Sequence, residues 1–337
     1  MKKISKETIG EIFVGFDTLT WAAFPVLISY GAKIMPPILF ASLGYFVSSV
    51  VIFLYLIFRG QLSLLKNKKA FFNILMIVIF IVILPSIFLF KGTRLSSGIN
   101  TSLLMQMEIV FTFLIYSLIG FEKITFVRII GAILAIIGSV FVMYNGSFSV
   151  NYGELLIILA VFFYPIGNIF AKKALGMVSP IVILFYRGWL GGLALLIISF
   201  LIEDYGNNIF EVLKNGMFVI LISGTLVHFI SKLFWYGALK RIDVNKAVLL
   251  GSGSTPAVSM LYAYMFLGEV PNINQWIGFL LILCGIFVVV MRRRKGEVVE
   301  VAVGAGGFSL SSLPSYGGSG STSHEICRPY FSLHCIV

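Results

Sequence analysis

Charged residues are scarce in this chain. Only 12% of its residues are Asp, Glu, Lys or Arg, whereas 59% are hydrophobic and the mean hydropathy is +1.01. A soluble domain carries about 25% charged residues, because water must solvate its surface. The deficit excludes a soluble globular protein and predicts a chain whose solvent is lipid.

Patterns that bind metals or nucleotides are also missing. Cys284 lies in an apolar run, Cys327 and Cys335 lie near the C-terminus, and none has the spacing of a metal site. No Gly-x4-Gly-Lys-Ser/Thr loop is present, which argues against ATP as an energy source. A membrane enzyme acting on lipid would need a cluster of His, Asp or Cys, and only His228 lies in the apolar region. We therefore expect no cofactor, no metal and no enzymatic activity.

The positive charge that is present follows the loops. The net charge is +11, and its Lys and Arg residues gather in short segments between apolar runs. With the N-terminus in the cytoplasm, eighteen of them fall in cytoplasmic segments and four in outer segments. Such a bias orients membrane proteins. It predicts a multi-pass protein of the cytoplasmic membrane with both termini in the cytoplasm, and no nucleic-acid partner.

Ten windows are apolar and long enough, at about 20 residues, to cross a bilayer. Backbone groups in hydrocarbon must be hydrogen-bonded internally, so each window is expected to be a helix. The fold class predicted is therefore all-α integral membrane. The windows are 8–29, 37–58, 71–90, 96–120, 125–144, 154–175, 180–201, 217–239, 244–267 and 274–291.

The two halves of the chain repeat each other. An offset of 147 residues places Arg94 on Arg241, Glu122 on Glu269, Gly131 on Gly278 and Gly138 on Gly285. An offset of 143 places Gly10-Glu11 on Gly153-Glu154 and Pro37 on Pro180. Because each unit has five spans, the second unit is inverted, as in secondary transporters. We expect repeats at 1–146 and 147–295, then a flexible tail at 296–337 that is possibly not native.

The end of each half resembles the drug/metabolite transporter superfamily, specifically its ten-span EamA-like members. The residues run from Glu108-Ile109-Val110-Phe111 to Gly120-Phe121-Glu122, and from Thr255-Pro256-Ala257-Val258 to Leu267-Gly268-Glu269. A Gly-x6-Gly helix follows each. Ile109, Phe121 and Thr255 depart from the family pattern. The resemblance covers about residues 7–292 and implies a secondary transporter, generally an exporter, without identifying its substrate.

Acidic and aromatic residues in the first window are candidates for the substrate pathway. A charged side chain at the centre of a span is expensive and is retained for function or for a buried ion pair. Asp17 is such a residue, and Trp21 lies on the same helix face at i+4. The alternative is an ion pair between Asp17 and a cation on a neighbouring helix.

Polar stripes in the fourth and ninth windows are the second set of candidates. Thr101, Glu108 and Thr112 have helical spacing in one, and Ser252, Thr255 and Ser259 have it in the other. The offset of 147 places Glu108 on Thr255 and Thr112 on Ser259. We expect the stripes to line one central cavity; the alternative is ordinary hydrogen bonding between helices.

Cations inside the apolar windows complete the set. Arg187 needs an anion from the protein or the substrate, while Lys232 can snorkel toward an interface. Tyr164 in the sixth window is a further pathway candidate. The segment 251–256, with two Gly and one Pro, is expected to interrupt the ninth helix.

These patterns predict a transporter, rather than an enzyme, of a small polar or amphipathic metabolite such as an amino acid, an amine or a drug-like compound. Asp17 and Glu108 are the candidates for proton coupling. The alternatives are a structural or scaffolding membrane protein and a lipid-modifying enzyme. Glycine faces at Gly131, Gly138, Gly278 and Gly285 predict close packing between the halves or between two copies in a homodimer.

Overall fold

The computed structural model describes residues 5–67, 69–121, 124–144, 151–205, 209–239, 241–242 and 244–291. The predicted tail at 296–337 and Glu122 lie outside these residues. Helical segments of the first half are α1 (Lys6–Trp21), α2 (Ala23–Ile34), α3 (Pro37–Phe58), η1 (Leu62–Lys66), α4 (Phe71–Ile77), η2 (Val78–Ile83), α5 (Leu84–Arg94), α6 (Gly98–Leu104), α7 (Met107–Leu118) and α8 (Phe126–Met143). Those of the second half are α9 (Tyr152–Leu175), α10 (Pro180–Ile202), α11 (Ile209–Ile222), η3 (Ser223–Ile230), α12 (Ser231–Leu239), α13 (Val244–Tyr262), η4 (Ala263–Leu267) and α14 (Ile273–Met291).

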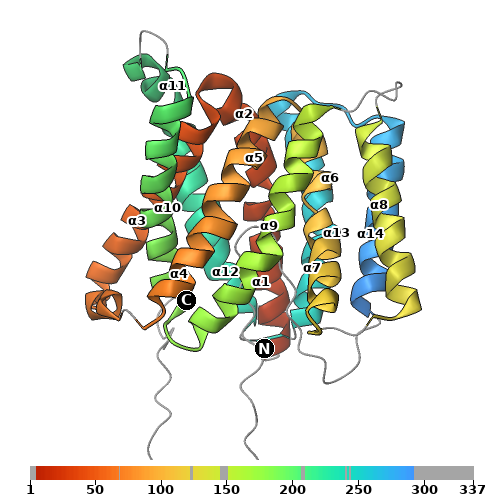
Figure 1. Cartoon of the computed structure of the whole chain (residues 1–337), viewed down its shortest axis with the longest axis horizontal. Coiled ribbons are helices and arrows are strands. Elements are labelled where there is room, and N and C mark those ends of the chain that lie inside the picture. The colour runs from red at the N-terminus through yellow and green to blue at the C-terminus, as the bar shows by residue number, and fades with distance from the viewer. Residues whose placement is uncertain are drawn as a thin grey trace, which may run out of the picture.

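These segments combine into long helices that lie side by side (Figure 1). Within the described residues, nine helical stretches are long and apolar enough to cross a bilayer. The tenth predicted span is α13 continued by η4, which lies alongside the others and has a polar middle at Gly251–Thr255. The prediction of an all-helical membrane protein with ten spans is confirmed.

Large apolar side chains cover the outside of the bundle. Phe58, Leu118 and Phe210 are more than 80% exposed, and α8 alone turns Ile130, Ile133 and Val140 outward. Such a surface would aggregate in water. It is the surface expected of a protein in contact with lipid.

Contacts between α3 and α10 show the inverted repeat directly. Ser42 Oγ donates to the Gly192 carbonyl at 2.8 Å, and Ser49 Oγ donates to the Phe185 carbonyl at 3.1 Å. The offset of 143 turns Ser42 into Phe185 and Ser49 into Gly192. The two residue pairs are therefore exchanged by a pseudo-two-fold axis that passes between these helices, although both donors are on α3. Pro37 and Pro180, which are equivalent residues, begin the two helices.

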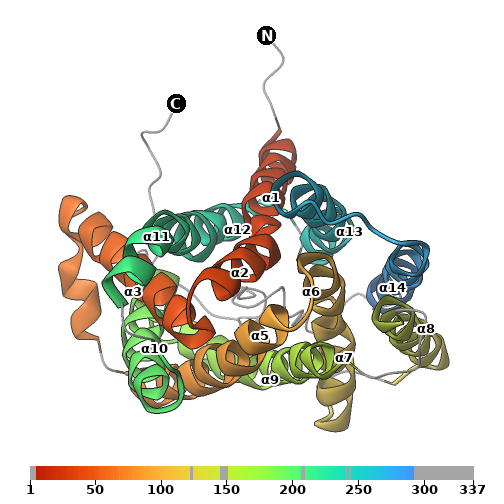
Figure 2. The same cartoon turned by 90° about the horizontal axis from the view of Figure 1, so that it is seen from above.

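The same axis passes between α8 and α14, at the opposite end of the bundle (Figure 2). A Cβ built on Gly131 would come within 2.8 Å of the Gly285 carbonyl oxygen, and one on Gly138 within 2.8 Å of the Gly278 oxygen. The offset of 147 exchanges these contacts. The glycine faces thus pack the two halves together; the homodimer remains a prediction.

The third and eighth spans share a local distortion. Each winds into a π-helix, η2 in one and η3 in the other. The offset of 147 carries Val78–Ile83 onto 225–230, so the wide turns occupy equivalent places. π-Segments inside helices are frequent at functional sites, and η3 carries His228 into the interior.

Candidate functional site

A cavity lies between α1, α12, α13 and the junction of α6 and α7. It is small in this conformation, with a volume of about 50 Å³. The residues that line it are Asp17, Trp21, Met105, Gln106, Glu108, Ile109, Trp235, Val248, Gly251, Ser252 and Thr255. Trp235 is one turn from the end of α12, and Val248 is one turn from the start of α13. The cavity therefore lies toward the N face, defined as the side of the bundle where α1 begins at Lys6.

The fourth span is interrupted where it borders the cavity. The Gln106 amide bonds to the Leu103 carbonyl at 3.2 Å and the Glu108 amide to the Met105 carbonyl at 3.2 Å, so the turn between α6 and α7 tightens to i→i−3 bonding. Tight turns inside a helix often mark functional hinges. This turn places Gln106, Glu108 and Ile109 together on the cavity wall.

The predicted interruption of the ninth span is wrong. α13 runs unbroken from Val244 to Tyr262 with Pro256 inside it. A proline removes one backbone hydrogen bond and is tolerated when neighbouring groups compensate. The discontinuity is found instead in the equivalent part of the fourth span, which contains neither Gly nor Pro.

Asp17 lies at the cavity wall with only 8% of its surface exposed. The Ser231 hydroxyl donates to Asp17 Oδ1 at 2.7 Å. Lys232, the next residue of α12, acts electrostatically on this carboxylate. Asp17 thus has both a hydrogen-bond donor and an attractive cation on the neighbouring helix.

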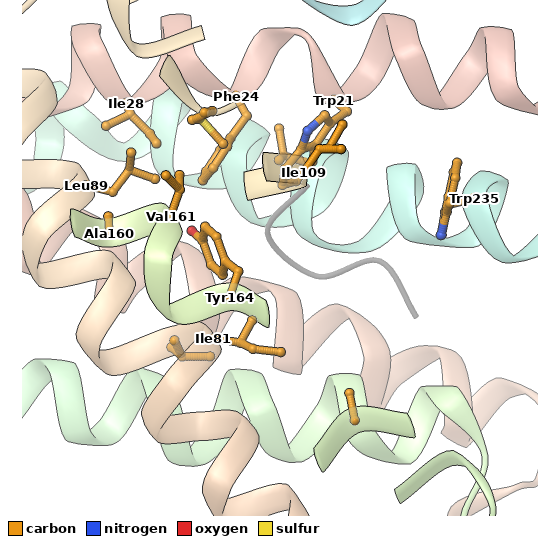
Figure 3. Packing of buried hydrophobic residues seen from close by; sticks show 14 of the residues in the cluster. Trp21, Phe24, Ile28, Ile81, Leu89, Ile109, Ala160, Val161, Tyr164 and Trp235 are labelled. Carbon is orange, nitrogen blue, oxygen red and sulfur yellow. The ribbon is translucent and has the colours of Figure 1, made fainter. Parts of the chain in front are cut away.

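Trp21 forms an adjoining part of the wall. The Lys232 ammonium lies 3.6 Å from the centroid of the Trp21 ring, a close cation–π contact. Phe24 stacks against Trp21 with ring centroids 4.8 Å apart. Figure 3 shows Trp21 beside Ile109, with Phe24 and Ile28 following along the same helical run. Aromatic packing therefore fixes the Trp21 ring between the cavity and the interior.

Glu108 brings the second carboxylate to the wall. It is 1% exposed, and the Asn168 side-chain amide of α9 donates to Glu108 Oε1 at 3.4 Å. Glu108 also acts electrostatically on Lys232. The cavity therefore presents two acidic side chains, with a shared cation behind them.

The structure brings together only part of the predicted site. Asp17, Trp21, Glu108, Ser252 and Thr255 line the cavity. The other five candidates are buried away from its wall, and their functional roles remain predictions. Thr101 bonds to Thr93, Thr112 bonds to the Glu108 carbonyl, and Tyr164, Arg187 and Ser259 lie elsewhere in the core.

Sequence reasoning missed Trp235 of α12, which lines the cavity. Lys232, which the sequence did single out, precedes it at i−3. That spacing was a signal available in the sequence, but an aromatic residue does not stand out in so hydrophobic a span.

A polar network closes the bundle on the face opposite the N face. Glu269, from the end of the ninth span, accepts hydrogen bonds from the Gly98 and Ile99 amides at 3.0 and 2.9 Å. It thereby caps α6. Asn100 links α6 to Glu154 of α9 and accepts from Gln275 of α14 at 2.6 Å. These hydrogen bonds join the two halves on this face.

Metal chemistry finds no support among the described side chains. No group of three or more His, Cys, Asp or Glu residues in this part of the chain has the arrangement needed to hold a metal ion. The cavity wall offers carboxylates, indoles and hydroxyls, which suit an organic ligand.

Comparisons with known proteins agree with this architecture. Residues 8–144 and 151–291 each match the EamA-like transporter family. The chain is 26% identical to "Uncharacterized transporter YoaV" of Bacillus subtilis, over 80% of this chain and 93% of that protein. It is 24% identical to the "Probable amino-acid metabolite efflux pump" of Salmonella typhimurium, over 84% and 95%. A crystal structure with 18% identity superposes with a TM-score of 0.59, over 84% of this chain and 96% of that one, which supports the fold alone. Since the family match spans both halves, the chain is a multi-pass membrane transporter that belongs to the EamA-like transporter family.

Proposed function

We propose that this protein is a secondary exporter of a small metabolite that carries an ammonium group, such as an amino acid or an amine. The observation that carries the proposal is the composition of the cavity wall. It combines the carboxylates of Asp17 and Glu108 with the indoles of Trp21 and Trp235. Carboxylates and aromatic faces are the groups with which proteins bind organic ammonium ions.

Lys232 supports this reading of the wall. Its ammonium rests on the face of Trp21 and interacts with both carboxylates. The Lys232 ammonium thus contacts the same kinds of group, an indole ring and carboxylates, that would bind the ammonium of a substrate. A structural or scaffolding protein has no need of charged groups beside a polar cavity in the bilayer, where each is costly.

The predicted orientation supports export. The distribution of Lys and Arg predicts that the N face is cytoplasmic, and the cavity lies toward that face. On the opposite face, Glu269 and Asn100 join the two halves. A substrate would therefore load from the cytoplasm. The name of the Salmonella relative, an efflux pump for amino-acid metabolites, is consistent with this direction.

Proton coupling completes the proposal. Asp17 and Glu108 are the acidic residues on the cavity wall. When the substrate ammonium leaves, a proton on one of these carboxylates would replace its charge. The return of the protonated carrier would then exchange protons inward for substrate outward.

The purified protein is expected to be stabilised by ammonium compounds. A ligand at 100 times its Kd adds about 2.7 kcal/mol to stability, so amines or amino acids from a screening panel should raise the apparent melting temperature by several degrees. The measurement is a thermal-shift screen in detergent. Each compound is paired with an analogue in which the amino group is replaced by a hydroxyl. Equal stabilisation by the hydroxyl analogues would contradict the proposal.

A further inference from the structure

Arg187 is a buried cation that forms no ion pair with the residues that the structure describes. It lies in the middle of α10, is 2% exposed, and its Nη1 forms no hydrogen bond in the described part of the chain. The side chain instead places its guanidinium carbon 5.9 Å from the centre of the Tyr45 ring. Arginine stays charged in proteins, and a lone buried charge is strongly unfavourable. The position therefore calls for an anion.

His228 lies beside Arg187 and is also unsatisfied. It is 2% exposed, and neither ring nitrogen has a hydrogen-bond partner among the described residues. Its ring stacks on Tyr45 at 4.6 Å, and it experiences the charges of Arg187 and Lys232. Two polar side chains on different helices thus share one aromatic neighbour and lack partners at the same place.

Gly44 lies next to these groups. A Cβ at this position would be in ordinary van der Waals contact, with Ser223 Oγ at 3.5 Å and the His228 ring at 3.9 to 4.0 Å. The offset of 143 makes Gly44 the repeat equivalent of Arg187. The second half therefore supplies a cation where the first supplies no side chain, and a bulky residue at position 44 would press against the His228 ring.

One aromatic residue separates this cluster from the cavity. Phe24 stacks on Trp21 of the cavity wall at 4.8 Å and contacts the His228 ring edge-on at 5.4 Å. The acids Asp17 and Glu108 lie on the cavity wall, where Lys232 interacts with both of them. On the other side of Phe24, the His228 ring lies within the electrostatic influence of Arg187. A substrate that reached both places would meet carboxylates at one end and a guanidinium at the other.

We propose that Arg187 and His228 form a second subsite, which binds the carboxylate of an amino-acid substrate when Phe24 moves aside. This inference rests on the proposed function, which assigns the ammonium group to Asp17 and the indoles. Arg187 would give the carboxylate charge-assisted hydrogen bonds, and His228 would donate a further one. The substrate is then an amino acid rather than a simple amine.

The test compares amino acids with their decarboxylated amines. The probes are leucine with isoamylamine, phenylalanine with phenethylamine, and lysine with cadaverine, measured by thermal shift and by counterflow in proteoliposomes. The wild-type protein should bind at least one amino acid about 10-fold or more tightly than its amine, since hydrogen bonds to charged groups are the strong ones. Arg187→Gln should remove this preference by weakening amino-acid binding, whereas amine binding should not weaken, because the substitution removes a cation from the interior.

Further variants distinguish loss of the subsite from misfolding of the Arg187→Gln protein. Gly44→Leu keeps both polar side chains but presses against the His228 ring, and it should weaken amino-acid binding selectively. Arg187→Lys should restore part of the preference. Arg94→Gln, an exposed change at the end of α5, serves as the matched control and should behave as wild type.

Several results would overturn the inference. Equal loss of amino acid and amine in Arg187→Gln would show a structural role for Arg187. A preference that disappears when chloride is replaced by gluconate would assign the subsite to an inorganic anion. Binding of amines without any amino acid would refute this subsite yet leave the proposed function intact, whereas binding of neither would refute both.

Discussion

Asp17→Asn is expected to abolish gradient-driven transport, with a loss of about 100-fold or more. The substitution keeps the shape of the side chain and its hydrogen bond from Ser231. It removes the charge that would hold the substrate ammonium or a proton. The substitution also leaves Lys232 without the electrostatic attraction of this carboxylate, so a moderate loss of stability should accompany the loss of transport. The measurements are uptake into proteoliposomes under a proton gradient and the melting temperature of each variant.

The double variant Asp17→Asn/Lys232→Met separates transport from stability. The double variant lacks both the Asp17 carboxylate and the Lys232 ammonium, so no cation is left without this carboxylate. Its melting temperature should therefore return toward that of wild type. Transport should remain absent, because the acidic group is still missing. If the double variant transports substrate, Asp17 is only the counter-ion of Lys232, and the proposed role of Asp17 fails.

The overall fold followed from the sequence because the bilayer leaves few alternatives. Long apolar windows must be helices, and five spans per repeat require inversion. The sequence offsets then identified equivalent residues in the two halves, and in the structure these residues occupy positions related by the pseudo-two-fold axis. Ser42 and Ser49 on α3, for example, bond to the residues that the offset of 143 predicts.

The repeat did not reveal which helix is interrupted. Glycine and proline in segment 251–256 indicated a break in the ninth span, but α13 is continuous there. The tight turn lies instead at Met105 and Gln106, which carry no such signal. Propensity is a weak predictor when packing against neighbouring helices determines the backbone.

Residues with an obvious cost of burial, or with an equivalent in the other repeat, were the ones that the sequence predicted at the candidate site. Asp17 and Glu108 stood out because carboxylates are rare inside spans, and both lie on the cavity wall. Met105, Ile109 and Trp235 also line it, but apolar side chains have no distinguishing pattern in an apolar helix. Their position depends on the crossing of α1, α12 and α13, which sequence periodicity does not encode.

The largest expected effect on stability concerns the contact between α8 and α14. Gly138→Leu would place a Cβ 2.8 Å from the Gly278 carbonyl oxygen and from the Ile282 amide nitrogen. Both obstacles are backbone atoms, so no rotamer change can relieve the overlap and the helices must separate. Overpacking of this kind costs about 1–3 kcal/mol or more, which corresponds to a fall of roughly 5–10 °C in melting temperature.

Gly15→Leu provides the matched control for this prediction. It makes the same substitution in a spanning helix, but a Cβ on Gly15 would meet nothing within 4 Å. Its melting temperature should stay close to that of wild type, measured by fluorescence-detected gel filtration after heating. Because the pseudo-two-fold axis exchanges the glycine contacts, Gly285→Leu, at the repeat equivalent of Gly138, should lower the melting temperature by a similar amount. A Gly138→Leu protein as stable as Gly15→Leu would show that the two halves are not held together through these glycines.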